Sequence, residues 1–288
     1  SLRRQRQMCI RDRSRPDPIP FFGELGSVNP VFVTAAADRA RGAEIAEQYV
    51  ASFTLGMGQF CTSPGLLIVP DGSATLAALE RATLPDPAPM LTASMRAGFD
   101  RAVGEVTALD GVSTLATVDG DDDLTAAVQL HRTTAARVLD DPETLLQECF
   151  GPSSVIVTYA DTAELTALAD ALPGQLTATV QGEDSDVGDD MQSLTGLLAR
   201  TAGRLLWNQW PTGVSVTDAQ HHGGPYPAST AIHTTSLGAK AIARFLRPIT
   251  YQNFPAGLLP QELHPGAGAD PESFRSVSYT HLTLPTKA

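Results

Sequence analysis

Residues 154–180 read SVIVTYADTAELTALADALPGQLTATV and contain one complete strand–helix–strand unit. The apolar run VIV predicts a first strand, and DTAELTALADAL predicts a helix that Asp161 caps at its amino end. Pro173-Gly174 ends this helix, and LTATV predicts a second strand. Because helical crossovers join parallel strands with a right-handed sense, the unit predicts a parallel sheet with helices on both faces, an α/β fold.

The rest of the chain shows the same alternation of short apolar and longer amphipathic runs. With the central unit included, the alternation predicts strands at 31–33, 66–69, 154–159, 176–180 and 204–207. It predicts helices at 36–52, 73–82, 90–108, 162–171 and 191–202. The acidic runs 121–123 and 183–190 are interpreted as solvated loops, because neither has the spacing of a calcium-binding loop.

The composition is that of an acidic globular protein. Of 288 residues, 42% are hydrophobic and 18% charged, and the net charge is −12. This charge argues against nucleic acid and anionic membranes as partners, since either would need a basic face. No apolar run approaches the roughly 18 residues that span a bilayer, and the amino end lacks the apolar core of a secretory signal. We therefore expect a cytoplasmic protein that acts on a small molecule.

The two ends differ in composition from the body between them. Residues 1–13, SLRRQRQMCIRDR, hold five arginines, whereas residues 276–288, SVSYTHLTLPTKA, are polar and threonine-rich. Both strings resemble translated sequencing adapters, so we expect residues 1–14 and 276–288 to be non-native. A basic targeting or RNA-binding arm is the competing interpretation of the first string. Without the +4 of residues 1–14 and the +1 of residues 276–288, the body carries −17.

Two segments contain residue types that suit catalysis better than packing. GMGQFCTSPG, 56–65, places Cys61 among glycines and a proline, so that a tight backbone path could point the thiol into a cleft. FGELGS, 22–27, places Glu24 between apolar residues and glycines. A thiolate attacks carbonyl carbon and needs a base or N–H donors nearby. Taken alone, Cys61 could also be a small buried hydrophobic residue, and Glu24 an ordinary surface or cap carboxylate.

Three motifs resemble those of the aldehyde dehydrogenases. ELGSVNP, 24–30, is similar to the ELGGKNP-type element of that family, and GQFC, 58–61, is similar to its GQxC nucleophile element. ECFGP, 148–152, is similar to its E-x-F-G-P cofactor-contact element. The three motifs occur in the family's order, and the likeness extends over residues 15–275. The resemblance implies a parallel-sheet aldehyde dehydrogenase catalytic domain.

The resemblance also implies how the chain is organised. The catalytic domain would occupy residues 15–245, followed by a tail at 246–275. Residues 247–254 of this tail resemble a strand that pairs with another subunit, so we expect a homo-oligomeric parent protein. The family places a Rossmann-like nucleotide-binding domain before the glutamate motif. That domain is not expected in this sequence, and we expect these residues alone to oxidise aldehydes poorly or not at all.

The same resemblance implies a mechanism. Cys61 would add to the aldehyde to give a thiohemiacetal and then a thioester, and Glu24 would activate the water that hydrolyses the thioester. This task favours a carboxylate whose pKa a dry pocket raises. Glu148 would hydrogen-bond the nicotinamide ribose, Phe150 would pack near the nicotinamide ring, and Cys149 would be a bystander. The cofactor would be NADP or NAD, and no metal is expected.

Other stretches indicate a branch of the family. WNQWPTGVSV (207–216), HHGGPYPAST (221–230) and FLRPITYQNFP (245–255) most resemble the branch that oxidises α-ketoglutaric semialdehyde, also called 2,5-dioxovalerate. The expected substrate is therefore a small aldehyde with an acid group at its far end. Trp207 and Trp210 are interpreted as core or pocket wall.

Two other classes of function stay open. A cofactor-independent cysteine hydrolase or acyltransferase would pair Cys61 with a histidine, and would depend on His221 or His222 and not on Glu24. Both histidines lie in a glycine-rich loop, where we expect surface side chains. A non-catalytic interaction module predicts that Cys61 reacts with alkylating agents no faster than an unperturbed thiol.

Overall fold

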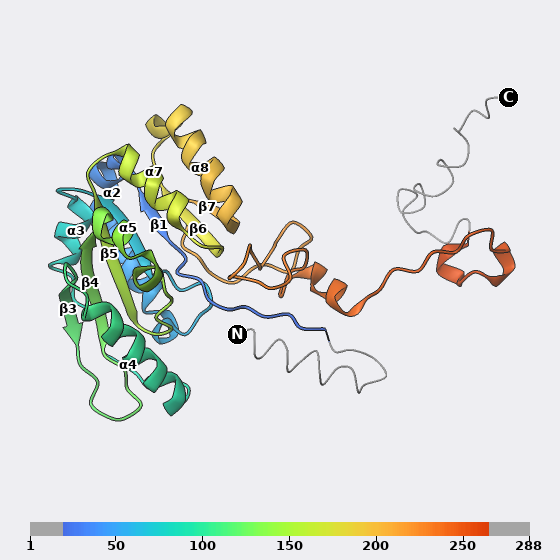
Figure 1. The fold of residues 1–288 in the computed structure, drawn as a ribbon, viewed down its shortest axis with the longest axis horizontal. Coiled ribbons are helices and arrows are strands. Elements are labelled where there is room, and N and C mark those ends of the chain that lie inside the picture. Colours follow the sequence, from blue (N-terminus) through green and yellow to red (C-terminus); the bar gives the residue numbers. More distant parts are fainter. Residues whose placement is uncertain (1–19, 265–288) are drawn as a thin grey trace. The chain divides into compact units, whose positions relative to one another are not determined.

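The computed structural model describes residues 20–264 (Figure 1). The chain divides into two compact units after Arg244. The segments 1–14 and 276–288, which we expect to be non-native, lie outside the described residues. Between residues 20 and 264, no helix has both the length and the apolar character that crossing a membrane requires.

A seven-stranded sheet forms the centre of the first unit (Figure 1). Its strand order is β3-β4-β5-β2-β1-β6-β7, and only the edge pair β3–β4 is antiparallel among these neighbours. The strands are β1 (Val31–Val33), β2 (Leu66–Pro70), β3 (Ser113–Val118), β4 (Val128–Thr134), β5 (Ser153–Tyr159), β6 (Gln175–Gln181) and β7 (Ala202–Trp207). The predicted α/β class with a parallel sheet is confirmed.

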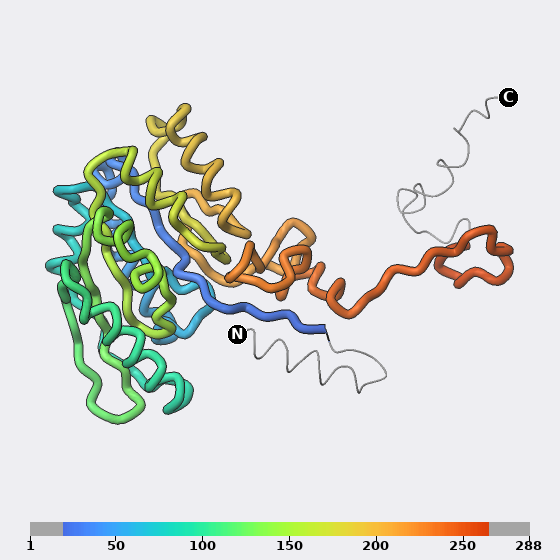
Figure 2. The backbone as a smooth tube through the Cα atoms, in the orientation of Figure 1, coloured from blue at the N-terminus to red at the C-terminus, as the bar shows by residue number. Residues whose placement is uncertain are grey.

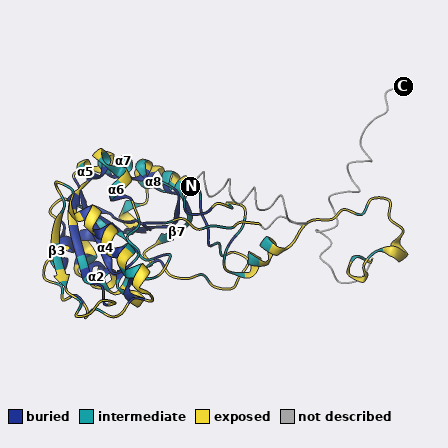
Figure 3. Ribbon diagram, turned by 60° about the horizontal axis from the view of Figure 1, so that its bottom comes forward, coloured by how far each residue is buried: buried dark blue, intermediate teal, exposed yellow. Residues whose placement is uncertain are grey.

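Helices cover both faces of this sheet. They are α2 (Ala35–Phe53), α3 (Ala74–Leu79), α4 (Ala93–Thr107), α5 (Ala135–Asp140), α6 (Pro142–Leu145), α7 (Thr162–Ala171) and α8 (Asp189–Thr201). One apolar cluster joins the sheet to α2 and α3, and a second joins it to α5, α7 and α8. Along β5, Ile156 belongs to the first cluster, whereas Val155 and Val157 belong to the second. This alternation follows from the two-residue period of a strand, and it concentrates the buried residues at the sheet (Figure 3).

The strand–helix–strand unit of residues 154–180 forms β5, α7 and β6 as predicted. The Asp161 side chain accepts a hydrogen bond from the Glu164 N–H at 3.0 Å, which confirms the predicted cap of α7. The two strands are not neighbours, because β2 and β1 lie between them. The alternation in the sequence missed β3, β4, α5 and α6.

The second unit is described from Phe245 to His264. It contains two short 3₁₀ helices, η4 (Ala256–Leu258) and η5 (Gln261–Leu263), and the rings of Tyr251 and Phe254 pack edge to face at 5.3 Å. Residues 247–254 form no strand within this described stretch. Their pairing with another subunit stays a prediction.

Candidate active site

The three motif residues lie at the edge of the sheet where the parallel strands begin. Glu24 precedes β1, Cys61 precedes β2 and Glu148 precedes β5. These three strands are adjacent in the order β5-β2-β1. Because parallel strands all begin at the same edge, segments that are far apart in sequence meet there. We call this side the amino edge of the sheet.

The buried Asn29 connects the segment of Glu24 to the loop of Cys61. Its side-chain amide donates hydrogen bonds to the carbonyl oxygens of Cys61 (2.9 Å) and Ser63 (3.0 Å). Its Oδ1 accepts a hydrogen bond from Ser27 Oγ at 2.8 Å. The Gln175 side chain at the start of β6 accepts a further bond from the Asn29 N–H at 3.1 Å. Asn29 belongs to the ELGSVNP motif, but its role in joining the two segments was not predicted from the sequence.

Two glycines bring the cysteine loop against the third motif. Gly58 has a φ of 62°, and a Cβ on it would lie 2.1 Å from the carbonyl oxygen of Gly151. Any larger residue at Gly58 would therefore collide with backbone. This close approach places GQFC and ECFGP side by side in space.

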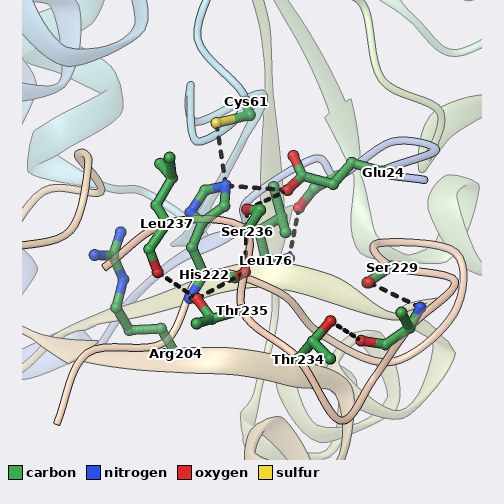
Figure 4. Close-up of polar contacts among 12 residues, drawn as sticks. Glu24, Cys61, Leu176, Arg204, His222, Ser229, Thr234, Thr235, Ser236 and Leu237 are labelled. Carbon is green, nitrogen blue, oxygen red and sulfur yellow. Dashed lines mark hydrogen bonds and ion pairs between the residues drawn. The ribbon is translucent and has the colours of Figure 1, made fainter. Parts of the chain in front are cut away.

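His222 lies between the cysteine and the glutamate (Figure 4). Its Nε2 is 3.4 Å from Cys61 Sγ and 3.6 Å from Glu24 Oε1. The imidazole is only 3% exposed, and the His222 N–H donates to Thr235 Oγ1 at 2.8 Å. The expectation that this histidine would be a surface loop residue was therefore wrong. The neighbouring His221 is half-buried.

The glycines that suggested a solvated loop are the reason that His222 is buried. A Cβ on Gly224 would lie 2.2 Å from the Gln175 carbonyl oxygen of β6. A Cβ on Gly203 of β7 would lie 1.9 Å from the Gly223 carbonyl oxygen. The chain after β7 thus runs directly against the sheet, and glycine marks close backbone approach rather than exposure.

The same chain after β7 also holds the segment before β1 (Figure 2). The Leu25 N–H donates to Pro227 O at 3.2 Å, and the Thr230 N–H donates to Gly23 O at 2.9 Å, so the two segments lie side by side. Ser236 Oγ from this region donates to Glu24 Oε1 at 2.6 Å. Glu24 is thereby oriented from one side, although 31% of its side chain remains exposed.

The contacts of His222 change its protonation and that of Glu24. Interactions first with Cys61 and then with Glu24 raise the pKa of His222 to about 9, so the imidazole is protonated at neutral pH. His222 in turn lowers the pKa of Glu24. Burial opposes this shift, but His222 and the hydrogen bond from Ser236 together outweigh it. The expectation of a raised pKa at Glu24 was wrong, because a cationic imidazole favours the carboxylate.

A raised carboxyl pKa occurs instead at Glu148. Burial raises the pKa of Glu148 to about 7, against a backbone hydrogen bond from Ser27 and with a contribution from the charge of Glu24. A Cβ on Gly26 would lie 3.3 Å from Glu148 Oε2. Glu148 lines a pocket of about 290 Å³ together with Leu25, Gly26 and Gln175. The carboxyl group therefore borders a cavity beside the Cys61–His222–Glu24 cluster.

The other residues singled out in the sequence have plainer surroundings. Phe150 and Cys149 are half-buried, and burial raises the pKa of the Cys149 thiol. The Trp210 ring packs at 5.8 Å from the ring of Tyr49, and its Nε1 donates to Gln48. Trp207 is 39% exposed. Trp210 therefore fits the interpretation as a core residue.

Arg204 on β7 is a cation near the cysteine that the sequence did not reveal. Its guanidinium donates to the carbonyl oxygens of Thr212 and Gly213, and its buried Nε has no hydrogen-bond partner. Among the described residues no carboxylate forms an ion pair with it. Burial lowers the pKa of Arg204, and negative charge on Cys61 opposes this shift. The positive charge beside the site therefore lacks an anionic partner within the described chain.

The segments that carry Glu24 and Cys61 also carry exposed apolar side chains. Phe21, Leu25, Leu55 and Phe60 are between 47% and 57% exposed. Exposed apolar side chains in the two motif segments are expected where a surface contacts a ligand or another part of a protein.

Comparison with known proteins identifies the family. The family model for the aldehyde dehydrogenase family matches residues 18–245. The chain belongs to the aldehyde dehydrogenase family. Its fold is also found in aldehyde dehydrogenase C of Pseudomonas syringae, solved with NAD+ and octanal, with a TM-score of 0.60 and 19% identity. That match covers 78% of this chain and 46% of the other.

Two curated aldehyde dehydrogenases are more similar in sequence. Alpha-ketoglutaric semialdehyde dehydrogenase 2 of Azospirillum brasilense is 43% identical over 256 residues, which cover 87% of this chain and 48% of the relative. Alpha-ketoglutaric semialdehyde dehydrogenase of Acinetobacter baylyi is 39% identical over 259 residues, which cover 88% of this chain and 49% of the relative. The chain thus spans about half the length of the curated relatives it matches.

Proposed function

We propose that this chain carries the catalytic domain of an NAD(P)-dependent dehydrogenase that oxidises an aldehyde to a carboxylic acid. The observation that carries the proposal is the meeting of Cys61, His222 and Glu24 at the amino edge, in a chain of the aldehyde dehydrogenase family. The oxidation is proposed for the whole protein. We expect residues 1–288 alone not to complete it.

The chemistry begins with Cys61 as the nucleophile. Its thiolate forms a C–S bond to the aldehyde carbon, and the former carbonyl oxygen takes the negative charge. We propose two donors for that oxygen: the Cys61 backbone N–H, and the protonated imidazole of His222, whose Nε2 is 3.4 Å from the sulfur. Donors that are already in place stabilise an oxyanion without reorganisation.

The residues at Glu148 fit the nicotinamide end of a dinucleotide. The carboxyl group borders the pocket that Leu25 and Gly26 line, and a carboxylate there can accept hydrogen bonds from ribose hydroxyls. A nicotinamide held there would supply the hydride acceptor for the carbon that is bonded to Cys61. Glu148 and Phe150 are proposed to position it, and NAD and NADP are both compatible with this end of the site. The product of the oxidation stays on Cys61 as a thioester.

Glu24 is proposed as the base that releases the product. Its carboxylate takes a proton from water, the resulting hydroxide attacks the thioester carbon, and the C–S bond breaks to return the Cys61 thiolate. The lowered pKa keeps Glu24 ionised at neutral pH, as a base must be. Its partial exposure gives water direct access to it.

We propose α-ketoglutaric semialdehyde as the substrate, on two grounds. Both curated relatives carry that substrate in their names. In addition, this substrate bears a carboxylate, and Arg204 supplies a guanidinium near Cys61 that forms no ion pair with a carboxylate of the described residues. Arginine is well suited to hold a carboxylate in a fixed direction.

The experiment is an oxidation assay on the protein as encoded at its source locus, read through both ends. We expect reduction of NAD+ or NADP+ with α-ketoglutaric semialdehyde, a lower kcat/KM with pentanal, which has the same chain length without the acid, and a loss of at least about 10³-fold in Cys61→Ser. Equal rates for Cys61→Ser and the unaltered protein would overturn the proposal. Equal rates for the two aldehydes would remove only the substrate assignment.

A cysteine hydrolase is the second candidate, because His222 contacts the Cys61 sulfur directly. It predicts that the 288-residue chain turns over an activated ester without nicotinamide, and that His222→Gln abolishes this while Glu24→Gln does not. Dependence on Glu24, with repeated turnover of aldehyde only when nicotinamide is present, favours the dehydrogenase.

A further inference from the structure

The Cys61–His222–Glu24 cluster offers a thiol, an imidazole and a carboxylate from three separate segments (Figure 4). One ligand atom from each lies within 4.8 Å of the other two, and between residues 20 and 264 no other group of His, Cys, Asp or Glu side chains does this. Glu24 comes from the segment before β1, Cys61 from the loop before β2, and His222 from the chain after β7. The three are thus independent ligands that the fold brings together.

Two of the three separations between these atoms match those around a tetrahedral zinc ion, and the third pair, the Cys61 sulfur and a Glu24 carboxylate oxygen, lies within 4.8 Å. With Zn–S about 2.3 Å and Zn–N and Zn–O about 2.0–2.2 Å, tetrahedral ligand atoms lie about 3.4–3.6 Å apart. The measured separations are 3.4 Å for Cys61 Sγ to His222 Nε2 and 3.6 Å for His222 Nε2 to Glu24 Oε1. An ion could enter with little movement of the two less exposed ligands, and the partly exposed Glu24 can adjust. Water would complete the fourth position.

The ligand set also selects the kind of metal. Thiolate and imidazole favour zinc and similar borderline or soft cations, whereas magnesium and calcium prefer sites made of oxygen alone. Hydrogen bonds from neighbouring groups fix the backbone of two ligands and the side chain of the third: Asn29 donates to the Cys61 carbonyl oxygen, Thr235 accepts from the His222 N–H, and Ser236 donates to the Glu24 carboxylate. Such outer contacts increase metal affinity by fixing the ligands in advance.

We propose that Cys61, His222 and Glu24 bind a zinc ion that reversibly inhibits the enzyme. Zinc displaces the proton on His222 Nε2 and any proton on the Cys61 sulfur; these protons pass to solvent, and no electron is transferred. The sulfur lone pair that would attack the aldehyde is then engaged in the Zn–S bond, and the Glu24 carboxylate is no longer available to water. Zinc binding is independent of the proposed function, whereas its inhibitory effect rests on it.

The test uses Co²⁺ as a spectroscopic stand-in for zinc, titrated into the 288-residue chain. We expect the visible bands of tetrahedral cobalt together with a near-ultraviolet thiolate-to-cobalt band, both removed by added Zn²⁺. The bands should be absent in Cys61→Ser, and the affinity should fall at least about 10-fold in His222→Gln and in Glu24→Gln. His221→Gln, which changes the adjacent histidine, and Cys149→Ser, which changes another thiol, are the matched controls and should leave the bands unaltered.

Bands that persist in Cys61→Ser, or that weaken equally in His221→Gln and His222→Gln, would overturn the proposal. So would the absence of the thiolate band in the unaltered chain when Cys61 still reacts with iodoacetamide, because the thiol is then accessible but does not bind the metal. None of these readouts requires aldehyde oxidation. A normal cobalt titration with no oxidation by the locus-encoded protein would therefore overturn the proposed function and leave the metal site standing.

Discussion

The two edges of the sheet carry similar polar side chains and use them differently. At the carboxyl edge, Asp38 in the first turn of α2 accepts hydrogen bonds from Ser73 Oγ (2.6 Å) and from the N–H groups of Ala74 (2.8 Å) and Thr75 (2.9 Å). All three donors belong to the start of α3, so this carboxylate joins two helices. At the amino edge, Glu24 instead contacts His222 and remains partly exposed.

This difference indicates that the reactive side chains of the fold lie at the amino edge of the sheet. Ligands of open parallel sheets usually bind outside the carboxyl ends of the strands. Here the carboxylates of that edge hold the starts of helices, as Asp38 and Asp161 do. The polar groups of the amino edge lie against one another, and the pKa values of Glu148 and His222 are raised as a result of burial and of mutual contact, respectively. Polar side chains that contact one another, and do not cap a helix, have the perturbed pKa values that are typical of functional sites.

The largest stability effect is expected at the carboxyl edge, from Asp38→Asn. Although burial opposes it, hydrogen bonds from Ser73 and Thr75 lower the pKa of Asp38. The substitution removes a buried, hydrogen-bonded charge and should lower the free energy of unfolding by about 2–4 kcal/mol in a denaturant titration. Iodoacetamide should still modify Cys61 at the wild-type rate under native conditions.

The pH dependence of Asp38 gives a second readout of the same claim. A lowered folded pKa means that its contribution is present above pH 3.8 and is lost as pH falls through the folded value. Asp38→Asn should therefore flatten the acid loss of stability below about pH 4. Asp170→Asn, which changes an exposed aspartate of α7, is the control and should alter stability by less than about 0.5 kcal/mol. A comparable loss in both variants would contradict the assignment of Asp38 as a structural residue.

A smaller change in the free energy of unfolding, an increase rather than a decrease, is expected at the amino edge from Glu148→Gln at pH 8. Burial raises the pKa of Glu148 to about 7 from its usual 4.5, so its contribution to stability is complete below pH 4.5 and is lost as pH rises through 7. The partly exposed carboxyl should cost about 1–3 kcal/mol at pH 8. Glu148→Gln should therefore be more stable than wild type at pH 8 and equal to it near pH 4. Greater stability at pH 4 than at pH 8 in both proteins alike would contradict burial as the cause.

The smallest effect should appear at Arg204, on the choice between anionic and neutral reagents. If its charge attracts a substrate carboxylate, it should also attract iodoacetate. The ratio of the rates at which iodoacetate and iodoacetamide modify Cys61 should then be higher in the unaltered chain than in Arg204→Met. A contribution of about 1 kcal/mol corresponds to about a 5-fold change in the ratio of the two rates. Arg204→Lys keeps the charge and should retain most of the preference. An unchanged ratio in Arg204→Met would remove Arg204 from the substrate site.

The sequence predicted the parts of the fold that repeat a strong pattern. Apolar runs such as VFV and VIV became the buried strands β1 and β5, because strands covered on both faces must be apolar throughout. The edge strand β3 reads STLATV and has no buried residue, and β4 carries His131 and Arg132 within VQLHRTT, so neither showed a comparable run. The strand order depends on long-range packing, which local periodicity does not contain.

The candidate site divides in the same way. Cys61 and Glu24 could be selected because glycine-flanked reactive residues are unusual, and the structure brings both into contact with one imidazole. His222 is predicted to be a surface residue because the glycines beside it suggest a solvated loop, although the same glycines allow close packing on β6 and β7. The two glycines that follow His222 were the feature of the sequence that could have indicated close packing against the sheet. Arg204 gave none, since one arginine at the start of a predicted strand ordinarily points to solvent.

The most direct test of the central claim is to trap the acyl group on Cys61. The locus-encoded protein with Glu24→Gln would be mixed with α-ketoglutaric semialdehyde and NAD+ or NADP+, and its peptides examined by mass spectrometry. Glu47→Gln, at an exposed position of α2, is the matched control. The account predicts an acyl adduct that persists on Cys61 in Glu24→Gln and turns over in Glu47→Gln. An adduct on another residue, or equal turnover in the two variants, would contradict it.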